Sequence, residues 1–145
     1  MRALALAAAL AGCGHAQKGE PALVLPPYPR AERLIEIFVS PTSELRFFVD
    51  PASVEPGSDG AVRYTLVARS PAGAENVSYE ALRCESGEAR IYAVGRNGEW
   101  VLASSDWRAS RTPWQAMLYR DYFCPLRQPI ASREEGVRVL RSGGR

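Results

Sequence analysis

The clearest pattern in the sequence is a regular alternation of hydrophobic and polar positions in the middle of the chain. In the stretch 62–69, every second residue is apolar: Val62, Tyr64, Leu66 and Ala68. This period of two is typical of a β-strand with one buried face. Similar short apolar stretches lie on both sides of it. The predicted strands are 45–49, 62–69, 76–84, 89–96 and 99–103.

Short turn-forming sequences separate these strands. Asp59-Gly60 and Asn97-Gly98 are pairs that favour two-residue hairpin turns, because both accept positive φ angles. Pro71 with Gly73, and the triplet 85–87, mark two further turns. The pattern therefore predicts an antiparallel meander of about four to five strands.

Two helices are predicted after the strands. Thr112 is a good N-cap, Pro113 suits the first helical position, and Gln115 completes a capping box. Pro125 ends this helix. Its apolar face consists of Trp114, Leu118 and Tyr122.

A second capping box at 132–135 opens another short helix, and the stretch 30–39 fits either a short helix or an extended segment. The fold class expected from these patterns is α+β: the meander packed by two or three short helices, with one disulfide. We place this single domain at 28–141 and a flexible tail at 142–145.

The first thirteen residues have the pattern of a bacterial lipoprotein signal. Arg2 is followed by an apolar stretch of about eight residues, which is too short to cross a bilayer. Leu10-Ala11-Gly12-Cys13 then matches a lipobox, with small side chains before the cysteine. We therefore predict a signal peptide at 1–12 and lipidation of Cys13. A plain secretory signal cut after Ala16 is the alternative.

Lipidation of Cys13 would make the membrane a partner of the chain and place it in the bacterial cell envelope. Gly14 stands where an aspartate would favour retention in the inner membrane, so we expect the outer membrane, facing the periplasm. The segment 13–27 is polar and rich in proline, and we predict that it is a flexible tether carrying the lipid.

Once Cys13 is lipidated, Cys84 and Cys124 remain as a pair in an oxidising compartment. A disulfide between them is the natural interpretation. Two buried free thiols, or one reactive thiol, are the alternatives.

The balance of charges and the histidine count narrow the function. The chain has 18 basic and 16 acidic residues, which argues against a nucleic-acid partner. His15 is its one histidine and lies beside the predicted anchor, so a triad based on histidine is not expected in the domain. We predict no metal and no cofactor. Acidic pairs such as Glu80 with Glu85, or Asp106 with Asp121, leave a weak carboxylate-dependent hydrolase open.

One polar, aromatic stretch is a candidate ligand-binding site. Trp107 lies in a polar segment, and Arg108 and Arg111 are close to it in sequence. An aromatic ring with neighbouring guanidinium groups is suited to glycans or peptides. Core packing is the alternative for tryptophans 100, 107 and 114.

Several motifs occur in an order that resembles the cryptic neisserial protein (CNP1-like) family of bacterial envelope proteins. The motifs are 26–29 (PPYP), 47–53 (FFVDPAS), 62–70 (VRYTLVARS), 76–80 (NVSYE), 83–84 (RC), 113–114 (PW) and 118–125 (LYRDYFCP). The resemblance covers about residues 26–127 and implies no particular activity. We therefore expect a non-enzymatic envelope lipoprotein that binds an envelope protein or peptidoglycan, or has an accessory structural role. A glycan- or small-ligand-binding module is the alternative.

Overall fold

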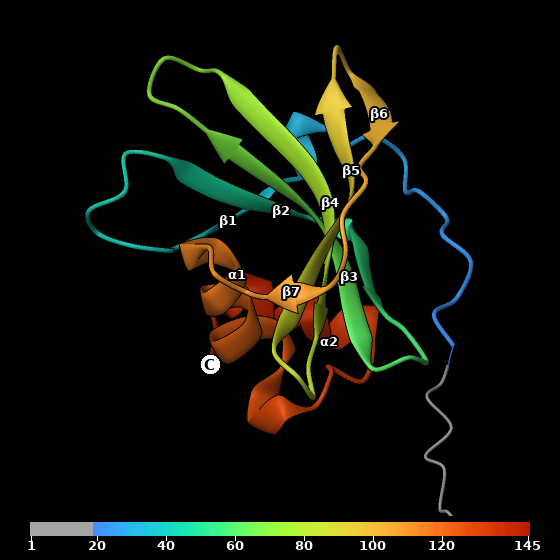
Figure 1. Cartoon of the computed structure of the whole chain (residues 1–145). Coiled ribbons are helices and arrows are strands. Elements are labelled where there is room, and N and C mark those ends of the chain that lie inside the picture. Colours follow the sequence, from blue (N-terminus) through green and yellow to red (C-terminus); the bar gives the residue numbers. More distant parts are fainter. Residues whose placement is uncertain (1–18) are drawn as a thin grey trace, which may run out of the picture.

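One antiparallel sheet organises the chain in the computed structural model, which describes residues 19–145 (Figure 1). Six of its strands lie side by side in sequence order, and β7 pairs with β5 beyond the end of β6. The meander is confirmed, with more strands than predicted. The strands are β1 (Ile35–Ile37), β2 (Arg46–Pro56), β3 (Ala61–Arg69), β4 (Glu75–Arg83), β5 (Glu88–Arg96), β6 (Glu99–Leu102) and β7 (Arg108–Ala109).

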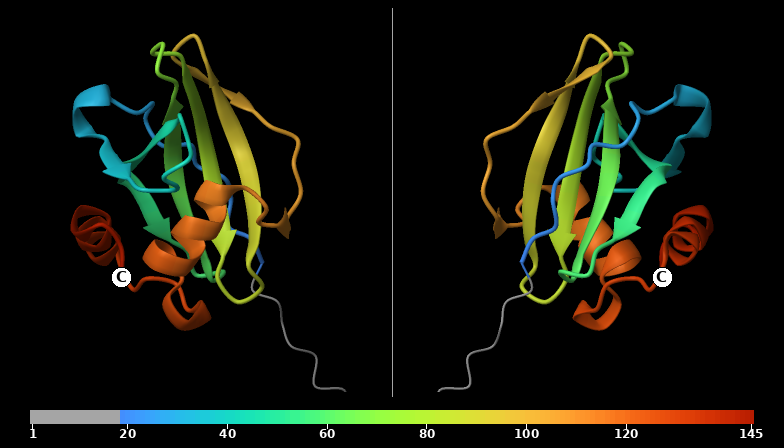
Figure 2. Two further views of the ribbon diagram at one scale, coloured as in Figure 1. Left: turned by 90° about the vertical axis from the view of Figure 1, so that its left-hand side faces the viewer. Right: turned by 90° about the vertical axis from the view of Figure 1, so that its right-hand side faces the viewer.

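The principal helices cover one face of this sheet, which we call the inner face (Figure 2). Thr112 caps the first of them, accepting a hydrogen bond from the backbone N–H of Gln115 at 3.3 Å. The predicted α+β class is therefore confirmed. The helical segments after the strands are α1 (Pro113–Met117), the π-helical turn η2 (Leu118–Phe123), the 3-10 turn η3 (Pro125–Arg127) and α2 (Arg133–Ser142).

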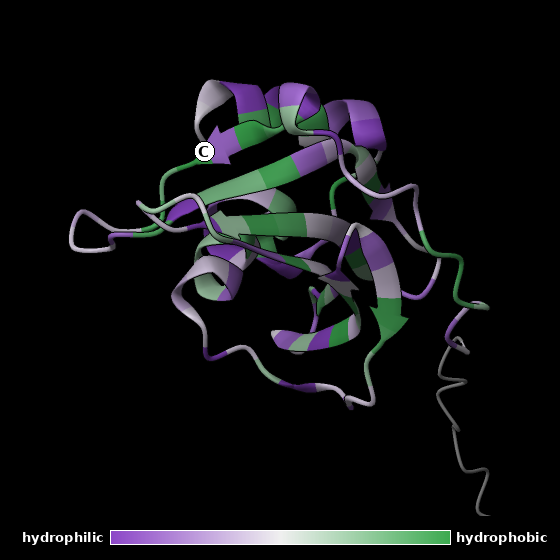
Figure 3. Cartoon of the chain, turned by 90° about the horizontal axis from the view of Figure 1, so that it is seen from above, coloured by the Kyte–Doolittle hydropathy of each residue, from purple (hydrophilic) through white to green (hydrophobic). Residues whose placement is uncertain are grey.

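The main hydrophobic core lies between the inner face and the helices. Val62, Tyr64 and Leu66 of β3 point into it, as their alternation predicts. Leu118 and Tyr122 of the predicted apolar face are buried against them from η2, and Trp114, its third residue, packs on the core while partly exposed. When the chain is coloured by hydropathy, the strands carry long hydrophobic stretches and the turns are mostly hydrophilic (Figure 3).

The opposite, outer face of the sheet is crossed by residues 19–34, which we call the N-terminal strap (Figure 2). Leu25 and Tyr28 pack on apolar side chains of the sheet. The indole N–H of Trp100 donates to the carbonyl of Pro26 at 2.8 Å, and the rings of Tyr28 and Trp100 lie 5.1 Å apart.

The strap departs from the prediction of a flexible tether over 13–27. From Glu20 onward, the chain is held on the sheet by side-chain contacts. Its prolines prevent regular backbone hydrogen bonding, but an extended proline-rich segment can still pack through its side chains. The predicted signal peptide at 1–12 and the predicted lipidation site Cys13 lie outside the described residues.

Two other segments are better defined than the sequence suggested. The ambiguous stretch 30–39 contains both a 3-10 turn, η1 (Ala31–Arg33), and strand β1. The predicted flexible tail at 142–145 lies against η2, where the backbone N–H of Arg145 donates to the carbonyl of Asp121 at 2.9 Å. No helix in the described part of the chain is long and apolar enough to cross a membrane.

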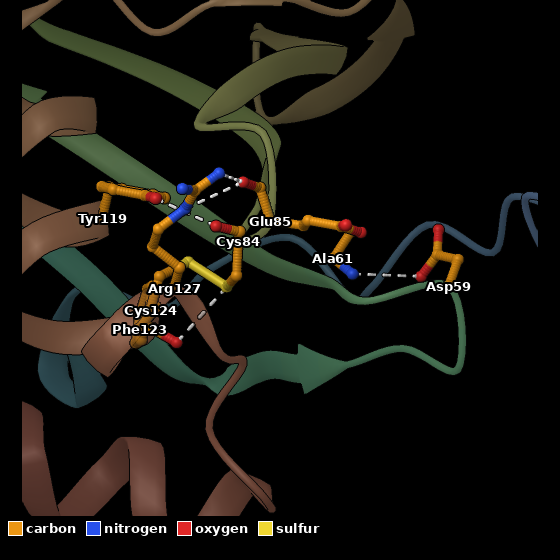
Figure 4. Close-up of a disulfide and its surroundings, with 8 residues drawn as sticks. All are labelled: Asp59, Ala61, Cys84, Glu85, Tyr119, Phe123, Cys124 and Arg127. Carbon is orange, nitrogen blue, oxygen red and sulfur yellow. Dashed lines mark hydrogen bonds between the residues drawn. A yellow bond between two sulfur atoms is a disulfide. The ribbon is translucent and has the colours of Figure 1, made fainter.

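A disulfide joins Cys84, just after β4, to Cys124, just after η2 (Figure 4). Both cysteines are buried. The hydroxyl of Tyr119 donates to the carbonyl of Cys84 at 2.9 Å, and Arg127 donates to the carbonyl of Glu85. The predicted pairing is confirmed, and it attaches the end of the first helical region to the sheet.

Candidate functional site

A pocket of about 560 Å³ lies between β5, the segment 104–112 and the start of α1. Ala89 and Ile91 of β5 are among its lining residues. A volume of this size is in the range of small-molecule sites. The polar residues that line it are Arg90, Ser104, Ser105, Asp106, Arg108, Arg111, Thr112 and Gln115.

The pocket exists because two short strands share one edge of β5. Leu102 of β6 pairs with Ala93, whereas Arg108 of β7 pairs with Ala89. Between these pairs, the hydroxyl of Ser105 accepts from the N–H of Ile91 at 3.0 Å and donates to its carbonyl at 2.7 Å. One side chain thus replaces the backbone partner that β5 would otherwise have there.

The structure separates the three candidate residues from the sequence. Arg108 and Arg111 line the pocket, but Trp107 lies on the outer face. There its ring meets that of Tyr92 edge to face at 6.4 Å, and the guanidinium of Arg83 lies 4.0 Å from its centroid. Because successive side chains of an extended segment point to opposite faces, residues 107 and 108 do not face the same site.

Arg108 and Arg111 are exposed, and neither forms an ion pair within residues 19–145. The neighbouring arginines of β4 and β5 differ: Arg83 pairs with Glu88 at 3.2 Å, and Arg90 pairs with Glu20 at 2.9 Å. Arg108 and Arg111, unlike the pocket residue Arg90, therefore have their hydrogen-bond donors available for an anion.

Gln115 is the buried polar residue of the pocket, with 6% of its surface exposed. Its side-chain N–H donates to a carboxylate oxygen of Glu80 at 3.0 Å. Sequence reasoning missed this role, since it assigned the Gln115 side chain to a capping box. Only the backbone N–H of Gln115 takes part in the cap.

Glu80 lies behind Gln115 on the inner face and is 1% exposed. It accepts hydrogen bonds from the hydroxyls of Tyr64 at 3.0 Å and Ser78 at 2.6 Å. Burial, followed by the negative charge of Glu80, raises the pKa of Tyr64 well above its usual value of 10. Tyr64 is therefore a fixed hydrogen-bond donor. The sequence held no clear signal for this group. Glu80 shares its face of the strand with Ser78 and Leu82, whereas the apolar side of the alternation is formed by Val77, Tyr79 and Ala81.

The acidic pairs considered from the sequence do not converge in the pocket. Asp106 lines it, but Asp121 pairs with Arg120 at 2.7 Å, and Glu85 is exposed in the turn between β4 and β5. Across residues 19–145, no group of three or more histidine, cysteine, aspartate or glutamate side chains is arranged to hold a metal ion.

These features define a class: an α+β domain with helices on one face of an antiparallel meander and a polar pocket at the sheet edge. The model of the CNP1-like family matches residues 15–141. The chain belongs to this family, whose function is uncharacterised, and the resemblance seen in its motifs is confirmed. Comparisons with curated proteins and with solved structures found no match.

Proposed function

We propose that the chain is an envelope lipoprotein, anchored through Cys13, whose domain binds an anionic ligand without catalysis. One observation carries the binding proposal: Arg108 and Arg111, both without an ion-pair partner in the described residues, line the same pocket as the buried Gln115.

The chemistry of these groups selects the ligand. Guanidinium groups bind carboxylates and phosphates through charge-assisted hydrogen bonds, often two at a time. Asp106, on the same pocket, disfavours a ligand with dense negative charge. A ligand with a single anionic group fits this balance best. Peptidoglycan carries such groups as the carboxylates of its peptides, and it is the envelope polymer that we propose.

The strap sets how far an anchored domain would reach. Glu20 is held on the sheet, so only the residues from 13 to 20 would separate the lipid from the folded domain. An extended chain spans at most about 3.6 Å per residue, which gives a reach of about 25 Å. The proposed anchor would thus keep the domain close to the membrane surface, within reach of a polymer layer beside it.

Sedimentation with insoluble peptidoglycan tests the binding proposal. The unmodified protein should pellet with the polymer, and the double variant Arg108→Gln/Arg111→Gln should stay in the supernatant. A matched control is Arg138→Gln/Arg141→Gln, which removes the same charge from exposed positions of α2, a helix packed over β1 and β2. Equal loss of both double variants from the pellet would show that net charge, and not the pocket, is responsible, and full pelleting of Arg108→Gln/Arg111→Gln would overturn the proposed site.

Trp107→Ala gives a second control in the same assay. Because Trp107 lies on the outer face, this variant should pellet as the unmodified protein does. Its loss from the pellet would place the binding surface on the outer face instead.

Cell fractionation tests the anchor. Cys13→Ser should release the protein into the soluble envelope fraction and abolish labelling by a fatty-acid analogue. Membrane retention of an unlabelled, unprocessed Cys13→Ser protein would overturn the lipoprotein proposal.

A further inference from the structure

The orientation of the Gln115 side chain is fixed by its neighbour. Its side-chain N–H donates to Glu80 Oε2 at 3.0 Å, the same oxygen that accepts from the hydroxyl of Tyr64. Glu80 is itself held in place by Tyr64 and Ser78, and both of its oxygens are engaged. The Gln115 amide cannot reverse without placing its carbonyl oxygen against this carboxylate.

The carbonyl oxygen Oε1 of Gln115 is consequently the atom left over for a ligand. Within the described residues, the buried side-chain atoms without a partner are Thr65 Oγ1, Arg90 Nε and Trp114 Nε1. Gln115 Oε1 accepts no hydrogen bond from residues 19–145, yet it is not among these buried atoms. It therefore reaches solvent, and the solvent beside Gln115 is the pocket.

We infer that the ligand is an N-acylated amino acid or peptide end, with a free carboxylate and an adjacent amide N–H. This inference rests on the proposed anion site and names its ligand class. The carboxylate would bind Arg108 and Arg111, and the amide N–H would donate to Gln115 Oε1. Glu80 acts as a positioning residue, since it touches Gln115 and not the ligand.

The two arginines and Gln115 Oε1 together also disfavour binding of some simpler ligands. An inorganic anion would satisfy the arginines but would leave Gln115 Oε1 without a donor. A ligand with an oxygen at that position would face it with another acceptor. A site with a fixed acceptor discriminates against such ligands, because the ligand would displace the solvent that Oε1 meets without supplying a donor in its place.

Three probes that differ by one group test the inference on the full chain carrying Cys13→Ser, by calorimetric titration. They are acetyl-D-alanyl-D-alanine, the matching ester acetyl-D-alanyl-D-lactate, and the C-terminal amide of the first probe. The ester lacks the N–H, and the C-terminal amide lacks the carboxylate. We expect the first probe to bind roughly tenfold tighter than the ester, and the C-terminal amide to show no measurable binding.

Glu80→Gln tests the positioning role. A glutamine at 80 both donates and accepts, so Gln115 becomes free to turn over and the preference for amide over ester should fall toward one. The arginine-dependent part of the affinity should persist. Glu75→Gln is the matched control, because it makes the same change at an exposed end of the same strand and should retain the full preference.

The outcomes separate this inference from the proposed function. Equal affinity of the unmodified protein for amide and ester, with both lost in Arg108→Gln/Arg111→Gln, would overturn the ligand class and leave the anion site standing. The same holds if none of the probes binds a protein that pellets with peptidoglycan through these arginines. If neither the probes nor peptidoglycan depends on the arginines, the proposed function itself is wrong. The comparison of amide with ester needs no variant, so a Glu80→Gln protein that fails to fold does not remove the test.

Discussion

Reduction of the disulfide should cost the domain a large part of its stability. Cys84 and Cys124 are 40 residues apart in sequence, and the bond closes that loop in the unfolded chain. The chain-entropy relation gives about 4 kcal/mol for a loop of this length. A single domain has a total free energy of unfolding of roughly 5–15 kcal/mol. Reduction should therefore remove between about a quarter and about four fifths of this free energy.

Urea unfolding with and without reductant measures this difference. The chain should carry Cys13→Ser, so that only one pair of cysteines responds. With a typical urea dependence of about 2 kcal/mol per molar, the midpoint should fall by roughly 2 M on reduction. The double variant Cys84→Ala/Cys124→Ala should unfold near the reduced protein and should not respond to reductant.

A loss below about 1 kcal/mol would refute this reasoning, because it would mean that the unfolded chain gains little freedom when the loop opens. The same bond bears on the site. All pocket residues lie between Ala89 and Gln115, inside the loop that the disulfide closes. Ligand binding should therefore weaken in reductant under conditions in which the domain is still folded.

Two further changes test the strap and the packing of α2. Burial opposes ionisation of Glu20, but hydrogen bonds from Tyr92 and Trp107 and the charge of Arg90 outweigh it and hold its pKa below the usual 4.5. The stability that the ionised Glu20 gives to the packing of the strap is therefore present above pH 4.5 and is lost as the pH falls through the lowered pKa. Glu20→Gln should lose this stability at neutral pH, and the looser strap should be seen as stronger acrylamide quenching of Trp107 fluorescence. Gly136→Ala should destabilise the domain by about 1 kcal/mol in thermal unfolding, because a Cβ there would lie 2.7 Å from Ile130 and 2.8 Å from Val54, and this crowding exceeds the gain in helix propensity. An unchanged melting temperature would show that both side chains move aside freely.

The strands found from the sequence are those whose signal is local. The stretch 62–69 alternates over its whole length, and Asn97-Gly98 fixes a hairpin, so β3 and the β5–β6 turn were predictable. Strand β7 has only two residues and exists because Arg108 meets Ala89 across the sheet edge. A pairing between positions so far apart leaves no periodic pattern in either segment.

Part of the candidate site was predicted from the sequence: Arg108 and Arg111 line the pocket, but Trp107 does not. Sequence proximity grouped Trp107 with Arg108, but neighbours in an extended chain face opposite sides, and that segment carried no signal that it was extended. The role of Gln115 in the pocket was missed because a capping box already accounted for a glutamine at that position. The decisive partner, Glu80, is 35 residues away and could be connected to it only by the fold.

Strand β5 connects the pocket to the strap through one residue. Ala89, Arg90 and Ile91 all line the pocket, and the guanidinium of Arg90 also binds Glu20 of the strap. No strap residue lines the pocket itself, so a ligand bound there would meet the strap only through Arg90. The proposed binding site and the segment that leads toward the proposed attachment at Cys13 therefore share this arginine. Its ion pair with Glu20 distinguishes it from Arg108 and Arg111, which form no ion pair in residues 19–145.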